Sequence, residues 1–169
     1  MDRARLGDLD AFESIVRSRT DAVYRLSLAI TGDEADARDA AQESFVAAWR
    51  ELPGLRDADR FDAWLQRIVV NRCRMVIRAR SRRRVREIPA SLLPAPRADV
   101  AAASDADRLG AALSRLAPDH RAILALHHLE GRTIDELSAS LGIPAGTVKS
   151  RLFTARRALD RALGTEAEE

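Results

Sequence analysis

The sequence predicts an all-α protein made of two small helical domains joined by a flexible linker. Its 169 residues are 46% hydrophobic but only 4% aromatic, so its cores should consist of leucine, valine, isoleucine and alanine. Apolar residues recur at helical spacing on both sides of one Pro/Ala-rich segment, residues 87–104. We therefore expect an N-terminal domain over 1–86, a linker over 87–104 and a C-terminal domain over 105–169.

Composition and charge exclude several classes of protein. The single cysteine, Cys73, excludes an internal disulfide and a cysteine-rich zinc site. The first 30 residues carry charges throughout, unlike a signal peptide. No apolar run reaches the roughly 18–20 residues that a membrane-spanning helix needs. These features indicate a soluble, cytoplasmic protein, for which we expect no cofactor and no metal site.

Two long helices are predicted in the first 52 residues. The first covers about residues 10–31, and the second runs from Asp33 or Glu34 to Leu52. Acidic residues begin the second helix, where they interact favourably with the helix dipole, and a Pro-Gly pair follows it. The apolar strip of this helix should consist of Ala41, Phe45, Ala48 and Trp49. The residues expected to remain outside are Asp39, Gln42, Glu43 and Arg50.

A third helix should begin near residues 60–62 and continue into an arginine-rich stretch. Residues 67–86 contain nine arginines and no acidic residue. At about 100° per residue, four polar side chains fall within one narrow sector of this helix. They are Arg67, Asn71, Arg74 and Arg78. Such a stripe favours contact with a polyanion or an acidic partner over a helix end that is merely solvated.

Two further helices are predicted after the linker. One begins at Ser104 or Asp105 and carries Leu109, Leu113 and Leu116. The next begins at Pro118, because proline suits the first position of a helix. Its core candidates are Ile123, Leu124, Leu126 and Leu129, and Gly131 should end it.

Residues 133–163 read as two helices joined by a tight turn. Thr133 and Glu136 have the spacing of a capping box, Gly142 can end a helix with a positive φ, and Pro144 can precede the next helix. Helix, short turn and helix form the signature of a helix-turn-helix. An αα-hairpin with a solvated basic face is the alternative.

The last of these helices has an apolar stripe and an opposite polar face. Val148, Leu152, Ala155 and Leu159 form the stripe. The opposite side and its flank carry Lys149, Ser150, Arg151, Phe153, Thr154 and Arg157. Such a face suits the DNA major groove, since Arg and Lys bind guanine edges or phosphates, and Phe or a Thr methyl can contact thymine.

Three motifs in a fixed order carry a family resemblance. They are DARDAAQESFVAAW at 36–49, FDAWLQRIVVNRCR at 61–74, and LAPDHRAILALHHLEGRTIDELSASLGIPAGTVKSRLFTARRAL at 116–159. Together they resemble the extracytoplasmic-function (ECF) class of bacterial RNA polymerase sigma factors, over about residues 9–86 and 106–163. The resemblance implies a two-domain initiation factor without enzymatic activity. Met75 and Thr154 depart from residues common in the family, which leaves the promoter sequence open.

The resemblance also implies a role for each surface. The segment of Asp39, Gln42, Glu43, Phe45 and Trp49 would dock on the coiled coil of the largest polymerase subunit. The stripe from Arg67 to Arg78, with the loop after Leu52, would engage and open the −10 promoter element. The six polar-face residues from Lys149 to Arg157 would read the −35 element. An anti-sigma factor is the implied regulator, and we expect the two domains of the free protein to fold onto each other.

Three other hypotheses remain open from the sequence. A stand-alone helix-turn-helix regulator would use the C-terminal pair without binding polymerase, and usually as a dimer. A metalloenzyme would use His120, His127, His128 and Glu130, although these residues match no known ligand spacing. Cys73 could act as a redox sensor, but a cysteine on an apolar helix face is more often a small core residue.

Overall fold

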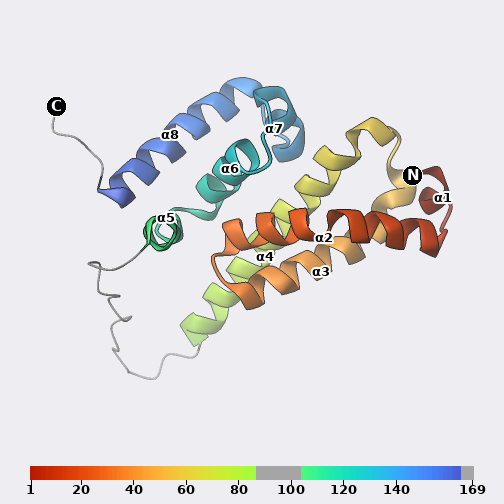
Figure 1. Ribbon diagram of the computed structural model, residues 1–169, viewed down its shortest axis with the longest axis horizontal. Helices are drawn as coiled ribbons and strands as arrows, with labels where there is room; N and C mark the ends of the chain where they lie inside the picture. The colour runs from red at the N-terminus through yellow and green to blue at the C-terminus, as the bar shows by residue number, and fades with distance from the viewer. Residues whose placement is uncertain (87–103, 165–169) are drawn as a thin grey trace.

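The computed structural model describes residues 1–86 and 104–164, which form helices and connecting turns without any β-strand in these ranges (Figure 1). The N-terminal domain contains α1 (Asp2–Arg5), α2 (Leu9–Thr31), α3 (Glu34–Glu51), the 3₁₀ turns η1 (Leu52–Gly54) and η2 (Ala58–Arg60), and α4 (Phe61–Arg86). The C-terminal domain contains α5 (Asp105–Ser114), α6 (Pro118–His128), α7 (Ile134–Leu141) and α8 (Ala145–Leu163). Of the expected linker over 87–104, all but Ser104 lies outside the described residues.

Side-chain caps fix where α2, α3, α5 and α7 begin. The carboxylates of Asp8 and Asp33 accept the backbone N–H groups of Ala11 and Asp36, each at 3.0 Å. Ser104 begins α5 with a capping box, in which its hydroxyl accepts the N–H of the residue three positions on. Such caps satisfy backbone donors that lack a partner inside the helix, so each start is set by local sequence.

α2, α3 and α4 pack against one another to form the N-terminal domain. The predicted apolar strip of α3 is only partly right, because Ala41, Phe45 and Trp49 are half-buried. The fully buried row consists of small residues: Ala37, Ala40, Ser44, Ala47 and Ala48. Small side chains let neighbouring helix backbones approach closely, and a search for large apolar residues does not find them.

The C-terminal core is formed by α6, α7 and α8, with α5 packed against α8. Ile123, Leu124 and Leu126 are buried as predicted. Leu129 is wrong as a core residue, since it is 62% exposed. Leu109 of α5 is also 43% exposed. Leu129 keeps helical backbone angles at the end of α6, and with Leu109 it lines an open apolar pocket of about 280 Å³.

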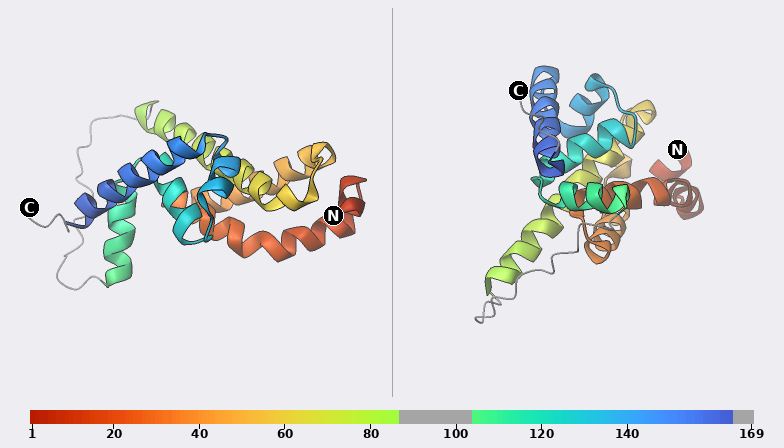
Figure 2. Two further views of the ribbon diagram at one scale, coloured as in Figure 1. Left: turned by 90° about the horizontal axis from the view of Figure 1, so that it is seen from above. Right: turned by 60° about the vertical axis from the view of Figure 1, so that its left-hand side comes forward.

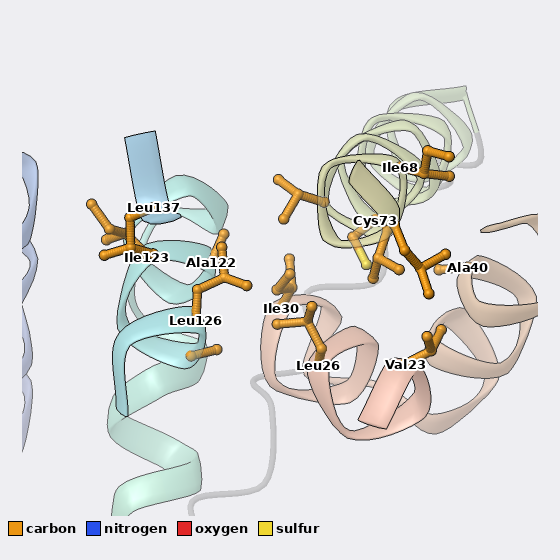
Figure 3. Packing of buried hydrophobic residues seen from close by; sticks show 14 of the residues in the cluster. Val23, Leu26, Ile30, Ala40, Ile68, Cys73, Ala122, Ile123, Leu126 and Leu137 are labelled. Carbon is orange, nitrogen blue, oxygen red and sulfur yellow. The ribbon is translucent and has the colours of Figure 1, made fainter. Parts of the chain in front are cut away.

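The two domains pack against each other through an apolar seam, with α2 against α6 and α4 against α7. Leu26 and Ile30 of α2 point toward Ala122 and Leu126 of α6 (Figure 3). Each of these four side chains is at most 2% exposed. A single hydrophobic cluster therefore extends through both domains, where the sequence predicts two separate cores.

Polar contacts cross the same seam. Ser140 in α7 donates a hydrogen bond to the Gln66 side chain in α4 at 3.2 Å, and both residues are buried. Asp62 in α4 pairs with Arg19 at 3.0 Å and with Arg132 of the C-terminal domain at 3.9 Å. The closed packing therefore combines apolar burial with a directional hydrogen bond.

Candidate nucleic-acid and polymerase surfaces

α8 presents its predicted polar face to solvent along its whole length. Val148, Leu152 and Ala155 are buried against α6 and α7. All six predicted −35 residues from Lys149 to Arg157 are exposed, and the Phe153 ring is 63% exposed. α8 lies on the outer side of the C-terminal domain, away from α3 (Figures 1 and 2).

The hydroxyls on this face are already committed as donors. Ser150 donates to the carbonyl of Thr147 and Thr154 donates to the carbonyl of Ser150, each at 3.0 Å. Their oxygens can still accept, and the Thr154 side chain remains exposed. The face therefore offers cationic donors at Lys149 and Arg157, with acceptor and apolar groups between them.

Local contacts hold α8 at a fixed angle to α7. The Thr133 backbone N–H donates to Glu136 at 2.8 Å, which completes the predicted capping box. This backbone hydrogen bond, followed by bonds from the Thr133 hydroxyl and Arg132, lowers the pKa of Glu136. Gly142 has a φ of +67°, and Ser138 donates to the carbonyl of Ile143 at 2.6 Å. α7 is thus capped at both ends, and the hydrogen bond to Ile143 holds the turn that leads into α8.

The predicted basic stripe of α4 lies beside the domain seam. Arg67, Asn71 and Arg78 are exposed, whereas Arg74 is half-buried. The Arg74 Nε donates to the carboxylate of Asp119 in the C-terminal domain at 2.8 Å. The guanidinium of Arg67 lies against Gly142, 3.7 Å from where a Cβ would be. The seam thus engages two of the four stripe residues, which the sequence did not reveal.

A groove of about 660 Å³ separates α3 from the second half of α4. Asp39, Gln42 and Glu43 line its α3 side, opposite arginines of α4. Arg72 lies 3.9 Å from the Glu43 carboxylate. The C-terminal end of α4 projects beyond the other helices (Figure 2). The groove therefore carries carboxylates on one wall and guanidinium groups on the other, with apolar side chains between them.

Two exposed apolar side chains also line this groove, and neither was predicted from the sequence as a binding residue. Val46 is 43% exposed and Met75 is 55% exposed. Val46 follows Asp39 and Gln42 at helical spacing, which is the signal that could have identified it. Phe45 and Trp49, in contrast, do not line the groove. The Trp49 ring packs on Phe12 with centroids 4.9 Å apart.

The cysteine and the histidines considered as redox or metal-binding residues pack within the fold. Cys73 is fully buried, and burial raises the pKa of its thiol to about 11. The rings of His127 and His128 meet edge to face, with centroids 4.7 Å apart. Within residues 1–86 and 104–164 no three His, Cys, Asp or Glu side chains come together as metal ligands would. None of the described helices is long and apolar enough to cross a bilayer.

Comparison with known proteins identifies the family. The chain matches the family model "Sigma-70 region 2" over residues 15–83 and "Sigma-70, region 4" over residues 106–159. The RNA polymerase sigma-E factor of Streptomyces antibioticus is 35% identical over 161 residues, which cover 94% of this chain and 88% of the relative. The chain belongs to the ECF class of RNA polymerase sigma factors. It is therefore a sigma factor that directs transcription initiation.

Other relatives of this sigma factor differ in length, and two solved structures share its fold. The ECF sigma factor SigE of Mycolicibacterium smegmatis is 32% identical over 167 residues, and this chain spans 65% of its length. The solved structure of CnrH in complex with the cytosolic domain of CnrY is 28% identical, with a TM-score of 0.71 over 98% of this chain and 96% of that chain. RpoE of Bartonella quintana, in complex with the anti-sigma factor NepR, is 22% identical and shares the fold, with a TM-score of 0.73 over 94% of this chain and 100% of that chain.

Proposed function

We propose that this sigma factor binds the RNA polymerase core through the groove between α3 and α4. We further propose that it recognises a −10 element through α4 and a −35 element through α8. The observation that carries the proposal is the uninterrupted solvent-exposed face of α8, mounted on a capped helix-turn-helix. The proposed domains are 1–86 for polymerase and the −10 element and 105–169 for the −35 element, joined by residues 87–104. The protein would perform no catalysis itself, and its place of action would be the cytoplasm.

The −35 contacts are assigned by chemistry along α8. Lys149, Arg151 and Arg157 would bind guanine edges or phosphates, since cationic donors match those acceptors. Phe153 would contact a thymine methyl, because an aromatic ring that is 63% exposed gains by leaving water. Ser150 and Thr154 would accept hydrogen bonds from base amino groups, as their own protons are already donated.

The −10 contacts would use the basic stripe and the preceding loop. Arg67, Asn71 and Arg78 supply exposed donors, and Arg74 would become available when its ion pair with Asp119 breaks. Residues 56–60 are exposed and contain η2, so their polar and backbone groups can receive unpaired bases. Few aromatic side chains are exposed near this loop, so polar contacts would have to replace stacking.

The polymerase contact would be mixed in chemistry. Asp39, Gln42 and Glu43 supply polar groups, and Val46 adds an apolar centre to this surface. Phe45 and Trp49 would act indirectly, by holding α3 against the core. Polar groups around a small apolar centre are typical of interfaces that form and dissociate.

Promoter binding would require the closed packing to open. Elements about 17 base pairs apart lie roughly 60 Å apart along the duplex, at about 3.4 Å per base pair. The packing of α2 on α6 keeps the two domains in direct contact. An anti-sigma factor would be the natural stabiliser of such a closed form, and RpoE of Bartonella quintana has been solved with the anti-sigma factor NepR. Polymerase would favour the open form.

Run-off transcription with purified core polymerase tests the proposal. Wild-type protein should produce discrete transcripts from a genomic library, and a variant carrying Lys149→Ala and Arg157→Ala should lose them while still binding core polymerase. A double variant on the opposite end of the chain, Arg17→Ala with Glu13→Ala, removes an exposed ion pair and serves as the control. Absence of core binding by the wild-type protein would refute the proposal.

A further inference from the structure

A polar pocket lies where the two domains meet, apart from the DNA and polymerase surfaces. Its volume is about 250 Å³. The end of α2 and the second half of α4 contribute one wall, and α5 and α6 contribute the other. The residues that matter are Thr31, Gly32, Arg80, Ser81, Ser114 and Arg121. Each domain therefore supplies one arginine to the same cavity.

Arg121 is a buried cation without an acidic partner. The residue is only 8% exposed, and its Nε is buried without a hydrogen bond. None of the ion pairs among the described residues involves it. Burial, and then the positive charge of Arg80, lower the pKa of its guanidinium. A buried charge that lacks a counter-ion is costly, so this arrangement calls for an anion.

Backbone geometry leaves room for this arginine. The Arg121 Nη1 lies only 3.0 Å from the position that a Cβ on Gly32 would take. Gly32 also has a φ of +69°, a conformation that ends α2 and that glycine adopts without strain. Because residue 32 is glycine, the Arg121 guanidinium of the C-terminal domain can lie directly against the C-terminal end of α2.

Arg80 faces the cavity from the other domain. Its Nη1 pairs with Asp36 at 3.0 Å and with Asp33 at 3.6 Å, so two carboxylates compensate its charge and the unpaired cation at the pocket is Arg121. The hydroxyls of Thr31 and Ser114 already donate to carbonyls. The available donors are therefore the two guanidinium groups and the Ser81 hydroxyl. Guanidinium and hydroxyl donors of this kind are what a site for an oxyanion uses.

We propose that this pocket binds a small tetrahedral oxyanion, inorganic phosphate or the phosphate group of a small monoester, and that the bound anion holds the two domains closed. Two guanidinium groups approaching from different helices need a ligand with several acceptor oxygens, which a phosphate provides and a chloride does not. Without the anion, Arg80 and Arg121 repel each other across the seam. With it, both are attracted to one charge.

Binding to the closed form alone makes the anion a regulator. A ligand that binds one state and not another stabilises that state in proportion to its occupancy. Promoter binding separates the domains in the proposed function, so it would dismantle the pocket and release the anion. The ligand site itself depends only on the closed packing, and it can be tested without polymerase or DNA.

Calorimetric titration of the full-length protein with inorganic phosphate, at constant ionic strength, tests the site. We expect saturable binding of one phosphate per chain, with acetate and chloride giving none. Arg121→Gln should weaken phosphate binding by about tenfold or more, the value of losing a charge-assisted hydrogen bond. Arg17→Gln, on an exposed arginine of α2, is the matched control and should bind as the wild type. Circular dichroism establishes that each variant is folded.

Three outcomes would overturn the proposal. One is the absence of saturable binding in the wild type. A second is equal phosphate affinity in Arg121→Gln, which would assign the binding to the exposed arginines of α4. Acetate binding as tight as phosphate would also exclude a tetrahedral oxyanion. Glycerol phosphate is titrated in parallel, and the tighter of the two phosphates identifies the source of the ligand.

A second variant keeps the test independent of Arg121. Ser114→Glu places a carboxylate at the mouth of the pocket, so it should abolish phosphate binding and raise the unfolding temperature in phosphate-free buffer.

Spin labels at Ser14→Cys and Ala139→Cys, both exposed and on different domains, report closure of the two domains. Phosphate should narrow the distance distribution toward its short end. An unchanged distribution at saturating phosphate would refute the role in closure.

Discussion

At the scale of single residues, two exposed cations on α8 and one buried thiol on α4 lead to different predictions. Lys149 and Arg157 are exposed cations on a helix whose other face is buried at Val148, Leu152 and Ala155. Cys73 is a buried thiol on α4. Substitution of Lys149 or Arg157 should weaken promoter recognition without changing stability. Substitution of Cys73 should change stability without changing promoter recognition.

Replacing Lys149 or Arg157 by alanine should cost about 1–3 kcal/mol of binding to the correct −35 sequence, the value of a bidentate base contact. The loss should shrink on a scrambled −35 element. Holoenzyme affinity for the two duplexes measures this difference. Arg108→Ala, on an exposed arginine of α5, is the control. An equal loss on both sequences would reduce the residue to a phosphate contact.

Cys73 should be unreactive in the folded protein. Burial raises the pKa of the thiol to about 11 from an ordinary value of 9.0, so the folded state retains its proton between those two values while the unfolded state loses it. Unfolding free energy should therefore fall as the pH rises from 9 to 11. Denaturant unfolding of the wild type and of Cys73→Ala isolates this contribution, which the variant should lack. Rapid thiol titration of the native protein would contradict the assignment.

At the scale of helices, α3 separates residues that bind from residues that hold the helix in place. Gln42, Glu43 and Val46 line the groove, whereas Trp49 packs on Phe12. Gln42→Ala and Val46→Asp should each weaken core polymerase binding without lowering the unfolding temperature. Trp49→Ala should instead destabilise the fold by about 3 kcal/mol, because a large buried contact is lost. Fluorescence titration with core polymerase and thermal unfolding distinguish the two effects.

The capping box of α7 offers a second prediction at this scale. Thr133→Ala removes the cap and should cost about 1 kcal/mol of stability. It should also weaken binding to every −35 sequence alike, because it loosens the mounting of α8 and leaves its reading face intact. Thr20→Ala is the control for the loss of a threonine, because the exposed Thr20 hydroxyl donates only to the Val16 carbonyl of its own helix, α2. A sequence-dependent loss in Thr133→Ala would contradict this view.

Helix boundaries were predictable because local sequence sets them. The caps at Asp33 and Thr133 and the glycine at Gly142 stand where the structure uses them. The buried face of α3 was not predictable in the same way, because alanines at Ala37 and Ala40 carry little hydrophobic signal. The six −35 side chains of α8 are exposed, as are Arg67, Asn71 and Arg78, whereas Arg74 is half-buried and paired with Asp119. The assignment of all these residues to promoter bases remains a prediction.

At the scale of the whole molecule, the seam between the domains is the feature that periodicity could not reveal. Leu26 and Ile30 have the spacing of an ordinary core face, and nothing in that spacing says that α6 covers it. Residue pairs such as Gln66 and Ser140 are far apart in sequence, so only the folded chain brings them together. The resemblance to a family predicted two domains correctly. Their closed packing is the arrangement that would have to open for promoter binding.

The opening of this seam is the central claim, and a reversible cross-link tests it most directly. Gln66→Cys with Ser140→Cys replaces the buried hydrogen bond between α4 and α7 by a disulfide that holds the domains together. Run-off transcription with core polymerase should fail with the oxidised variant and return after reduction, while each single variant remains active under both conditions. Equal transcription by the oxidised, fully cross-linked protein would show that the domains need not separate, and would contradict the account.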